Sequence, residues 1–216
     1  MFIGHFAVAF AAKRAAPEIS LGTLILAAQL ADLAWPMFVM LGWESFRISP
    51  GFTAVTPFEF LHYPYSHSLL ALTLWGGALG SAFYALRRRA WAAVVIGAVV
   101  LSHWLLDAAS HAPDMPLTIG GSERVGLGLW NSLPATLAVE GAMFAAGLWL
   151  YGRQTRALDR TGRWSLIAFV AFLLISYIAA VFGPPPPSTT AVAWSGQGIW
   201  LLVAWGYWID RHRRIA

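Results

Sequence analysis

Long apolar runs, separated by short polar or basic segments, are the main pattern of this chain. Each of six runs is long enough to cross a hydrocarbon layer of about 30 Å, which takes about 20 helical residues. They cover residues 20–42, 66–86, 90–110, 129–151, 163–183 and 191–209. The run from Trp164 to Phe182 is apolar on every face, whereas strands of a membrane barrel alternate in polarity. The pattern predicts an all-α, polytopic bundle of six transmembrane helices.

Residues 1–12 form a further apolar segment, which is too short to cross the bilayer. As a helix it would rise only about 18 Å. Lys13 and Arg14 follow this segment, whereas a secretory signal peptide carries its positive charge before the apolar run. We therefore expect a short N-terminal half-span helix that is retained, within a single membrane domain of residues 1–216.

Basic residues are distributed unevenly between the two ends of the spans. Of the 14 Lys and Arg residues, only Arg47 and Arg124 fall on one side when the spans alternate in direction. Short loops rich in Lys and Arg stay in the cytoplasm. The pattern predicts a multi-pass protein of the bacterial inner (cytoplasmic) membrane with a cytoplasmic C-terminus. The net charge of +4 indicates contact with anionic membrane lipids, and nucleic-acid binding is not expected.

The composition agrees with a membrane protein and limits the chemistry. Hydrophobic residues make up 58% of the chain and charged residues 11%, which is too apolar for a soluble domain. The chain has no cysteine, so disulfides, iron–sulfur clusters and thiolate zinc sites are excluded. Any metal ion must therefore bind to nitrogen and oxygen atoms.

Histidines and carboxylates interrupt the apolar segments at a few points. An ionisable side chain in a lipid-embedded segment costs about 2.5 to 3.5 kcal/mol, so several at one depth indicate a shared partner, most simply a metal ion. His103 and Asp107 are four residues apart, which places both on one face of a helix. Pro36 deprives the carbonyl of Asp32 of its helical donor, which predicts a kink there.

The segment 62–68 adds two imidazoles near the outer side. Pro64 favours an extended chain before it, and Ser66 is a candidate helix N-cap. His67 would then open the second span, while His62 reaches the same point from a loop. The candidate metal ligands are therefore His5, Asp32, His62, His67, His103 and Asp107.

Glu140 lies in the middle of the fourth span and is a further candidate for the chemistry. A carboxylate that does not bind the metal would act as general base, and either Asp32 or Glu140 could fill this role. A protonated Glu140 that bonds to another helix is the structural alternative. Imidazole and carboxylate ligands suit zinc, which we expect as the divalent metal.

The polar segments, in this order, resemble the family of small membrane-bound metal-dependent hydrolases, whose described members include LexA-regulated inner-membrane proteins of bacteria. In that family an early His is followed by Leu-Pro-Asp-x-Asp, by His-Arg-Gly-x-Thr-His-Ser and by a Ser-His-x-x-x-Asp helix. Ala34 stands in place of the second aspartate of the first motif, and this departure from the family favours one metal ion over two, unless His111 or Glu140 replaces the missing ligand. Residues 116–216 would add further transmembrane helices. The matching positions, all within residues 1–115, are His5, Asp32, His62, His67, Ser68, Ser102, His103 and Asp107.

The sequence leaves several functions open. The first is a metal-dependent hydrolase with its site toward the extracytoplasmic face, acting on a phosphoester or a lipid-like substrate. The second is a transporter or permease that uses the same His and Asp groups to couple protons or metal ions. A di-iron oxidase of the desaturase type is disfavoured because paired His-His boxes are absent. A polar cluster that only fixes helix packing gains little, since hydrogen bonds in a membrane average about 0.6 kcal/mol.

Overall fold

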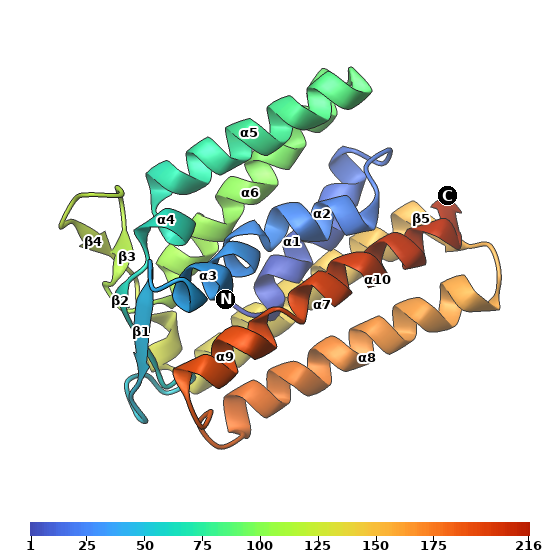
Figure 1. Ribbon diagram of the computed structural model, residues 1–216. Coiled ribbons are helices and arrows are strands. Elements are labelled where there is room, and N and C mark those ends of the chain that lie inside the picture. The colour runs from blue at the N-terminus through green and yellow to red at the C-terminus, as the bar shows by residue number, and fades with distance from the viewer.

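The computed structural model describes residues 1–216 and is mostly helical (Figure 1). The helices are α1 (Ile3–Ala15), α2 (Leu21–Ala28), α3 (Leu30–Met40), α4 (Pro64–His67), α5 (Leu69–Arg87), α6 (Ala90–Ser110), α7 (Leu133–Gln154), α8 (Arg160–Phe182), α9 (Thr189–Gly196) and α10 (Ile199–Arg211), with a 3-10 turn at Leu129–Asn131. Three antiparallel pairs of short strands are β1 (Ser45–Ile48) with β2 (Phe58–His62), β3 (Met115–Pro116) with β4 (Arg124–Val125), and β5 (Thr155–Ala157) with β6 (Arg213–Ile215).

Four helices, α5 to α8, are long and apolar enough to cross a membrane. The pair α2 and α3 makes a fifth span if it is counted as one, although the two helices meet at 53°. The predicted count of six spans is wrong, because the sixth is not a continuous helix. It divides at Gln197 into α9 and α10, of 8 and 13 residues. Gly196 and Gly198 flank Gln197, and the poor helix propensity of glycine accounts for the break.

The bend in the first span lies at Gln29 and not at Pro36, where the sequence predicts a kink. Gln29 has φ −106° and ψ 11°, outside the helical region, and it ends α2 and precedes α3. The helix α3 continues through Pro36. Pro36 instead packs against α9, since a Cβ on Gly196 would lie only 2.6 Å from the Pro36 Cγ. The close approach of α3 and α9 therefore requires glycine at position 196.

Helix α1 is short, as predicted, and it is enclosed by other helices. It packs against α2, α6 and α7, and nine of its 13 residues are buried. Its closest neighbour is α7, where a Cβ on Gly147 would come within 2.3 Å of the Ala7 carbonyl oxygen. Phe10 packs edge-on against Phe144 and Phe169. This packing fixes α1, and therefore His5, in the interior of the protein.

The two ends of the helices differ in charge. Helices α1, α5, α7 and α10 carry Lys or Arg in their last turn, and α8 begins with Arg160. Figure 1 shows these ends on one side, together with β5 and the C-terminus, whereas β1 to β4 lie at the opposite side. One end of the bundle is therefore strongly basic, and the other carries the β1–β2 and β3–β4 pairs.

The chain before α5 differs from the predicted arrangement. Pro64 opens the one-turn helix α4, which agrees with the preference of proline for the first turn of a helix. Ser66 lies inside α4, and the N-cap of α5 is Ser68, whose Oγ accepts from the Ala71 N–H at 3.0 Å. His67 is thus the last residue of α4 and not the first of the long helix. Its side chain is buried at this turn.

Candidate metal site

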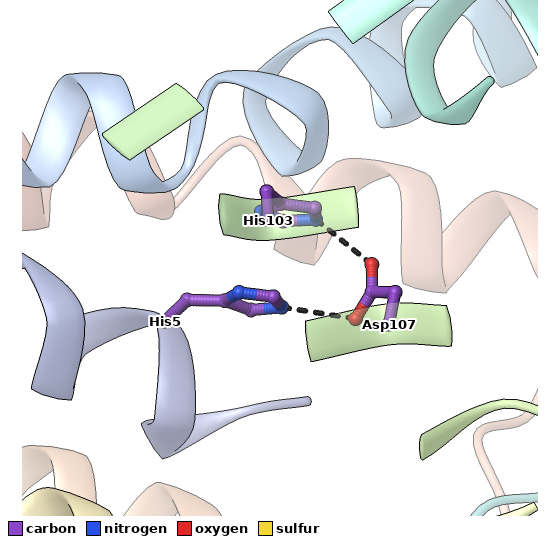
Figure 2. A group of neighbouring side chains, drawn as sticks. All are labelled: His5, His103 and Asp107. Carbon is purple, nitrogen blue, oxygen red and sulfur yellow. Dashed lines mark hydrogen bonds and ion pairs between the residues drawn. The ribbon is translucent and has the colours of Figure 1, made fainter. Parts of the chain in front are cut away.

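His103 and Asp107 lie one turn apart on α6, and His5 reaches them from α1. His103 Nε2 is 3.0 Å from Asp107 Oδ2, and His5 Nε2 is 3.1 Å from Asp107 Oδ1. The two imidazole rings are stacked, with centroids 3.7 Å apart and planes within 3° of parallel. Figure 2 shows both rings pointing toward the carboxylate of Asp107. All three side chains are buried, and they form one of two groups that could hold a metal ion.

The second such group shares His103 and adds Asp32 from α3 and His67 from α4. Asp32 Oδ1 lies 3.5 Å from His67 Nε2 and 3.8 Å from His103 Nε2. His67 Nε2 is also 3.8 Å from Asp107 Oδ2. Tetrahedral zinc binds ligands at about 2.0 Å, which separates neighbouring ligand atoms by about 3.3 Å. The four distances between a histidine Nε2 and a carboxylate oxygen in this set, 3.0 to 3.8 Å, fit that spacing.

The Nδ1 atoms of two histidines point away from this centre and donate to acceptors. His103 Nδ1 lies 2.7 Å from the carbonyl oxygen of Ala28. His111 Nδ1 lies 3.0 Å from Asp114 Oδ1, and its Nε2 is 3.9 Å from Asp107 Oδ1. A carbonyl or carboxylate oxygen only accepts, so each Nδ1 carries the hydrogen. In a neutral ring, Nε2 then presents its lone pair to the centre, as a metal-binding histidine requires.

His67 is oriented in the same way by a residue that the sequence does not single out. Its Nδ1 lies 2.7 Å from Ser66 Oγ, and the Ser66 hydroxyl donates to Glu44 Oε2 at 2.5 Å. Glu44 Oε1 also accepts the backbone N–H groups of Tyr65 and Ser66, each at 2.8 Å. Glu44 is only 2% exposed, although it lies between α3 and β1. The buried Glu44 carboxylate thus orients the His67 ring through Ser66.

Tyr63 supports His111 by binding the same carboxylate. Its hydroxyl donates to Asp114 Oδ1 at 2.7 Å. Burial raises the pKa of the Tyr63 phenol well above its usual value, and the Asp114 carboxylate raises it further. The hydroxyl therefore stays protonated and remains a donor. Asp114 in turn is held in place to accept from His111.

Two ring nitrogens in the ligand groups have no hydrogen-bond partner. His103 Nε2 lies close to Asp107 but not in hydrogen-bonding geometry, and His5 Nδ1 also makes no hydrogen bond. A buried polar atom without a partner is destabilising by about 1 to 3 kcal/mol. His103 is the residue that the two groups share. An unpartnered Nε2 at this central position, beside two carboxylates, is what a cation site requires.

His62 is not brought to this centre. It is exposed at the end of β2, with its ring beside that of Tyr65, and it belongs to neither group. The chain turns at Tyr63, which has φ −152° and ψ 44°, before α4 begins. His62 and His67 therefore lie on two different elements, and only His67 faces the interior.

Glu140 is fully buried on α7 and contacts the start of α1. Its Oε2 accepts the backbone N–H groups of Phe2 at 2.9 Å and Gly4 at 3.1 Å, while Oε1 has no partner. The first N–H groups of a helix lack intrahelical acceptors, so a carboxylate at this point stabilises the helix. Glu140 thereby fixes the segment that carries His5.

A cavity of about 610 Å³ opens from this centre. Asp32, His67, Asp107 and Glu140 line it, together with residues of the loop between β1 and β2 and residues at the end of α8. The Asp32 side chain is 31% exposed, whereas those of His67 and His103 are 4% and 1% exposed. Asp32 is therefore the candidate ligand most open to the cavity.

Comparison of the chain with protein-family models, with curated proteins and with solved structures finds no match in any of the three. The geometry of the centre, together with the sequence motifs, is therefore the basis of the function that we propose.

Ser66→Ala is expected to weaken metal binding although it removes no candidate ligand. Loss of the group that orients a metal-binding histidine lowers affinity by about 10- to 100-fold, and this substitution disconnects His67 from Glu44. Competition with a fluorescent zinc chelator measures the Kd. Ser102→Ala is the matched control, because the Ser102 hydroxyl bonds only to the Val99 carbonyl. Equal affinities of the two variants would show that Ser66 does not orient a ligand.

Proposed function

We propose that this protein is a metal-dependent hydrolase of the inner membrane, as its resemblance to the membrane-bound metal-dependent hydrolases implies. One observation carries the proposal: His67 and His103 each place Nδ1 against an outer acceptor and direct Nε2 toward the carboxylates. A cluster that only fixes packing needs satisfied hydrogen bonds, but it does not need two imidazoles from different helices in one tautomer around a common centre. A metal site does.

The ligands we propose are His67, His103 and Asp107, because the Nε2 atoms of His67 and His103 lie 3.8 and 3.0 Å from Asp107 Oδ2. Two imidazoles and one carboxylate suit zinc, and three protein ligands leave the fourth position of one ion open for water. When bound, zinc would lower the pKa of its water toward about 7 and would therefore supply hydroxide at neutral pH. His5 lies next to this set, against the other oxygen of Asp107.

Asp32 is the better placed of the two predicted general bases. Its contacts with His67 and His103 both use Oδ1, which leaves Oδ2 able to accept a proton from water in the cavity. Glu140 is fully buried, and its Oε2 is engaged by the backbone of Phe2 and Gly4. We therefore assign proton transfer to Asp32 and a positioning role to Glu140.

The proposal places the centre toward the extracytoplasmic face. The basic ends of the helices, which favour the cytoplasm, lie opposite the β1–β2 end in Figure 1. The cavity is walled by residues of the β1–β2 loop and by Pro184, Pro185 and Pro186, which follow α8 at that opposite end. A phosphoester or lipid-like substrate would then reach the site from outside the cytoplasm or from the outer leaflet.

A transporter that uses the same groups is the second candidate, and the packing of α1 argues against it. A coupled transporter needs polar groups across the full thickness of the membrane. Beyond His5, the interior is filled by Phe6 and Phe10, which pack against Phe144 and Phe169. All four rings are buried. This apolar layer favours an enzyme whose site opens to one face.

Removal of the metal is expected to abolish hydrolysis by the purified protein. The probes are bis(p-nitrophenyl) phosphate and p-nitrophenyl butyrate, and release of nitrophenol is followed in mild detergent. Treatment with the chelator dipicolinate should lower turnover at least about 100-fold, because the hydroxide is generated only at the metal. Zinc should restore turnover and magnesium should not, with zinc in protein-free detergent as the blank.

Equal turnover of chelated and zinc-loaded protein would contradict the hydrolase. Uptake of labelled zinc into proteoliposomes that is lost in Asp107→Ala would favour the transporter instead.

A further inference from the structure

The cavity at the His/Asp centre has no surplus of positive charge. No Lys or Arg side chain lines it, and three carboxylates do: Asp32, Asp107 and Glu140. The amino group of Met1 also lines the cavity and is paired with Asp107. One divalent ion and this amino group together do no more than balance the three carboxylates. The site therefore offers nothing that would compensate a doubly charged substrate group.

This charge balance distinguishes between classes of reacting group. A phosphomonoester carries a charge of about −1.5 to −2 at neutral pH. Removing such a dianion from water is unfavourable unless cationic groups pair with it. A carboxylic ester is uncharged, and a phosphodiester carries a single negative charge. Both could bind at this centre where a phosphomonoester would not.

One part of the cavity wall is apolar and follows a candidate membrane span. Ala179, Ala180 and Val181, near the end of α8, line the cavity. Their neighbours Ile178 and Phe182 are 56% and 61% exposed on the outer surface of the same helix. One end of the cavity is thus polar and holds the candidate ligands, and the other lies beside a helix that would face lipid. Such a cavity suits a molecule with a polar group at one end and an alkyl chain at the other.

We propose that the substrate is a membrane-resident amphiphile, whose scissile ester or phosphodiester lies at the His/Asp centre and whose alkyl chain lies along Ala179–Val181 of α8. This inference rests on the proposed hydrolase function and names its substrate class. In the reaction, the oxygen of water bonds to the carbonyl carbon or phosphorus, and the bond to the leaving oxygen breaks. Asp32 receives the proton of water, and the leaving alcohol takes up a proton, so no other reactant is needed.

The first test compares chromogenic probes that differ in chain length and charge. Hexadecyl p-nitrophenyl phosphate and ethyl p-nitrophenyl phosphate share one reacting group, and p-nitrophenyl phosphate adds a second charge. The zinc-loaded protein in mixed micelles should prefer the hexadecyl to the ethyl probe by at least about 10-fold in kcat/KM, since burial of a long chain adds favourable apolar contact. The phosphomonoester should be the poorest of the three. A faster phosphomonoester, or no preference for the long chain, would overturn the proposal.

Ala180→Trp tests the place of the alkyl chain. The indole would occupy the apolar wall, so the preference for the hexadecyl probe should fall by at least about 5-fold, mainly through KM. Ala168→Trp is the matched control, because Ala168 is exposed on the same helix and does not line the cavity. An identical chain-length preference in both variants would overturn this placement.

A second measurement does not depend on turnover. An uncleavable hexadecyl ether with a diazirine at the end of its chain is photolysed with the full-length protein, and labelled peptides are identified by mass spectrometry. Labelling should concentrate at residues 179–186 and fall in Ala180→Trp but not in Ala168→Trp. This labelling without hydrolysis of any probe would contradict the hydrolase while retaining the amphiphile as ligand. Labelling that is unchanged in Ala180→Trp would contradict the amphiphile itself.

Discussion

Replacing His103 with alanine is expected to remove nearly all of the metal that the purified protein retains. His103 is the only residue in both groups that could hold an ion. Its Nε2 lies 3.0 Å from an oxygen of Asp107 and 3.8 Å from an oxygen of Asp32. A three-ligand site that loses one of its two nitrogen ligands binds far less tightly, so zinc per chain should fall at least about 10-fold. Inductively coupled plasma mass spectrometry after desalting measures this content.

Asp107→Ala is expected to cause a similar loss for a different reason. One oxygen of Asp107 faces His103 and the other faces His5, so the carboxylate joins residues on α6 and α1. Its removal takes away a proposed ligand and also the group that holds the two stacked rings in register. Hydrolysis of bis(p-nitrophenyl) phosphate should fall in parallel with the metal content.

The matched control for these substitutions is His62→Ala. His62 is exposed and lies outside both groups, so its removal should leave the metal content unchanged. His103→Gln provides a second variant of similar size if the alanine variant does not fold, and size-exclusion chromatography with circular dichroism checks folding. Equal metal in wild type and in a folded His103 variant would contradict the proposed metal site.

The part of the centre that the sequence predicts well is the part that depends on local geometry. Residues four apart on a helix share a face whatever the surrounding fold, so His103 and Asp107 lie together as expected. The contacts of His5, Asp32 and His67 with this pair depend on how α1, α3 and α4 pack. The sequence still indicated His5, Asp32 and His67 as candidates, because ionisable residues are rare in apolar segments and these three follow the order of the motifs.

Glu44 shows what the sequence could not provide. Its contact with Ser66 brings together residues 22 positions apart, and no spacing rule connects them. The antiparallel pairing of β1 and β2 returns the chain so that the start of α4 lies beside Glu44. The one local indication was that the N–H groups at the start of a helix need an acceptor, which Glu44 supplies.

The prediction of six transmembrane spans was wrong for a related reason. Mean hydropathy reports whether a segment prefers lipid, but it does not report whether the backbone is one continuous helix. The segment 191–209 is apolar throughout, yet two glycines around Gln197 divide it. At Gln29 the break has no glycine or proline beside it, and only the packing of α2 and α3 reveals it. The low helix propensity of glycine accounts for the break at Gln197, whereas the break at Gln29 depends on tertiary structure.

Lys13→Met is expected to destabilise the folded protein by about 3 to 5 kcal/mol, because it leaves a buried carboxylate without its cation. The Lys13 Nζ donates to Asp210 Oδ2 and to the Ile19 carbonyl oxygen, each at 2.7 Å. The two charged side chains are only 5% and 14% exposed. Denaturant unfolding in mild detergent, followed by circular dichroism, measures the change.

The effect should be large because Asp210 joins several helices. Besides Lys13 of α1, it accepts the backbone N–H of Leu21 at the start of α2 at 2.9 Å and the hydroxyl of Tyr151 on α7 at 3.2 Å. An uncompensated charge on α10 therefore disturbs the contacts of three other helices. The double variant Lys13→Met with Asp210→Asn removes the charge but keeps an amide oxygen as acceptor for Leu21 and Tyr151. It should recover at least about half of the lost stability, as expected for coupled residues.

The exposed pair Arg47–Glu59 provides the control, since its atoms are as close as those of the buried pair. Arg47 Nε lies 2.6 Å from Glu59 Oε2, but the Arg47 side chain is 62% exposed. Solvent screens such a pair, so Arg47→Met should not measurably shift the unfolding midpoint. If Arg47→Met and Lys13→Met shift it equally, or if the double variant is no more stable than Lys13→Met, the buried charge of Asp210 is not the cause. If only the double variant fails to recover stability, the loss in Lys13→Met arises from packing around the Lys13 stem.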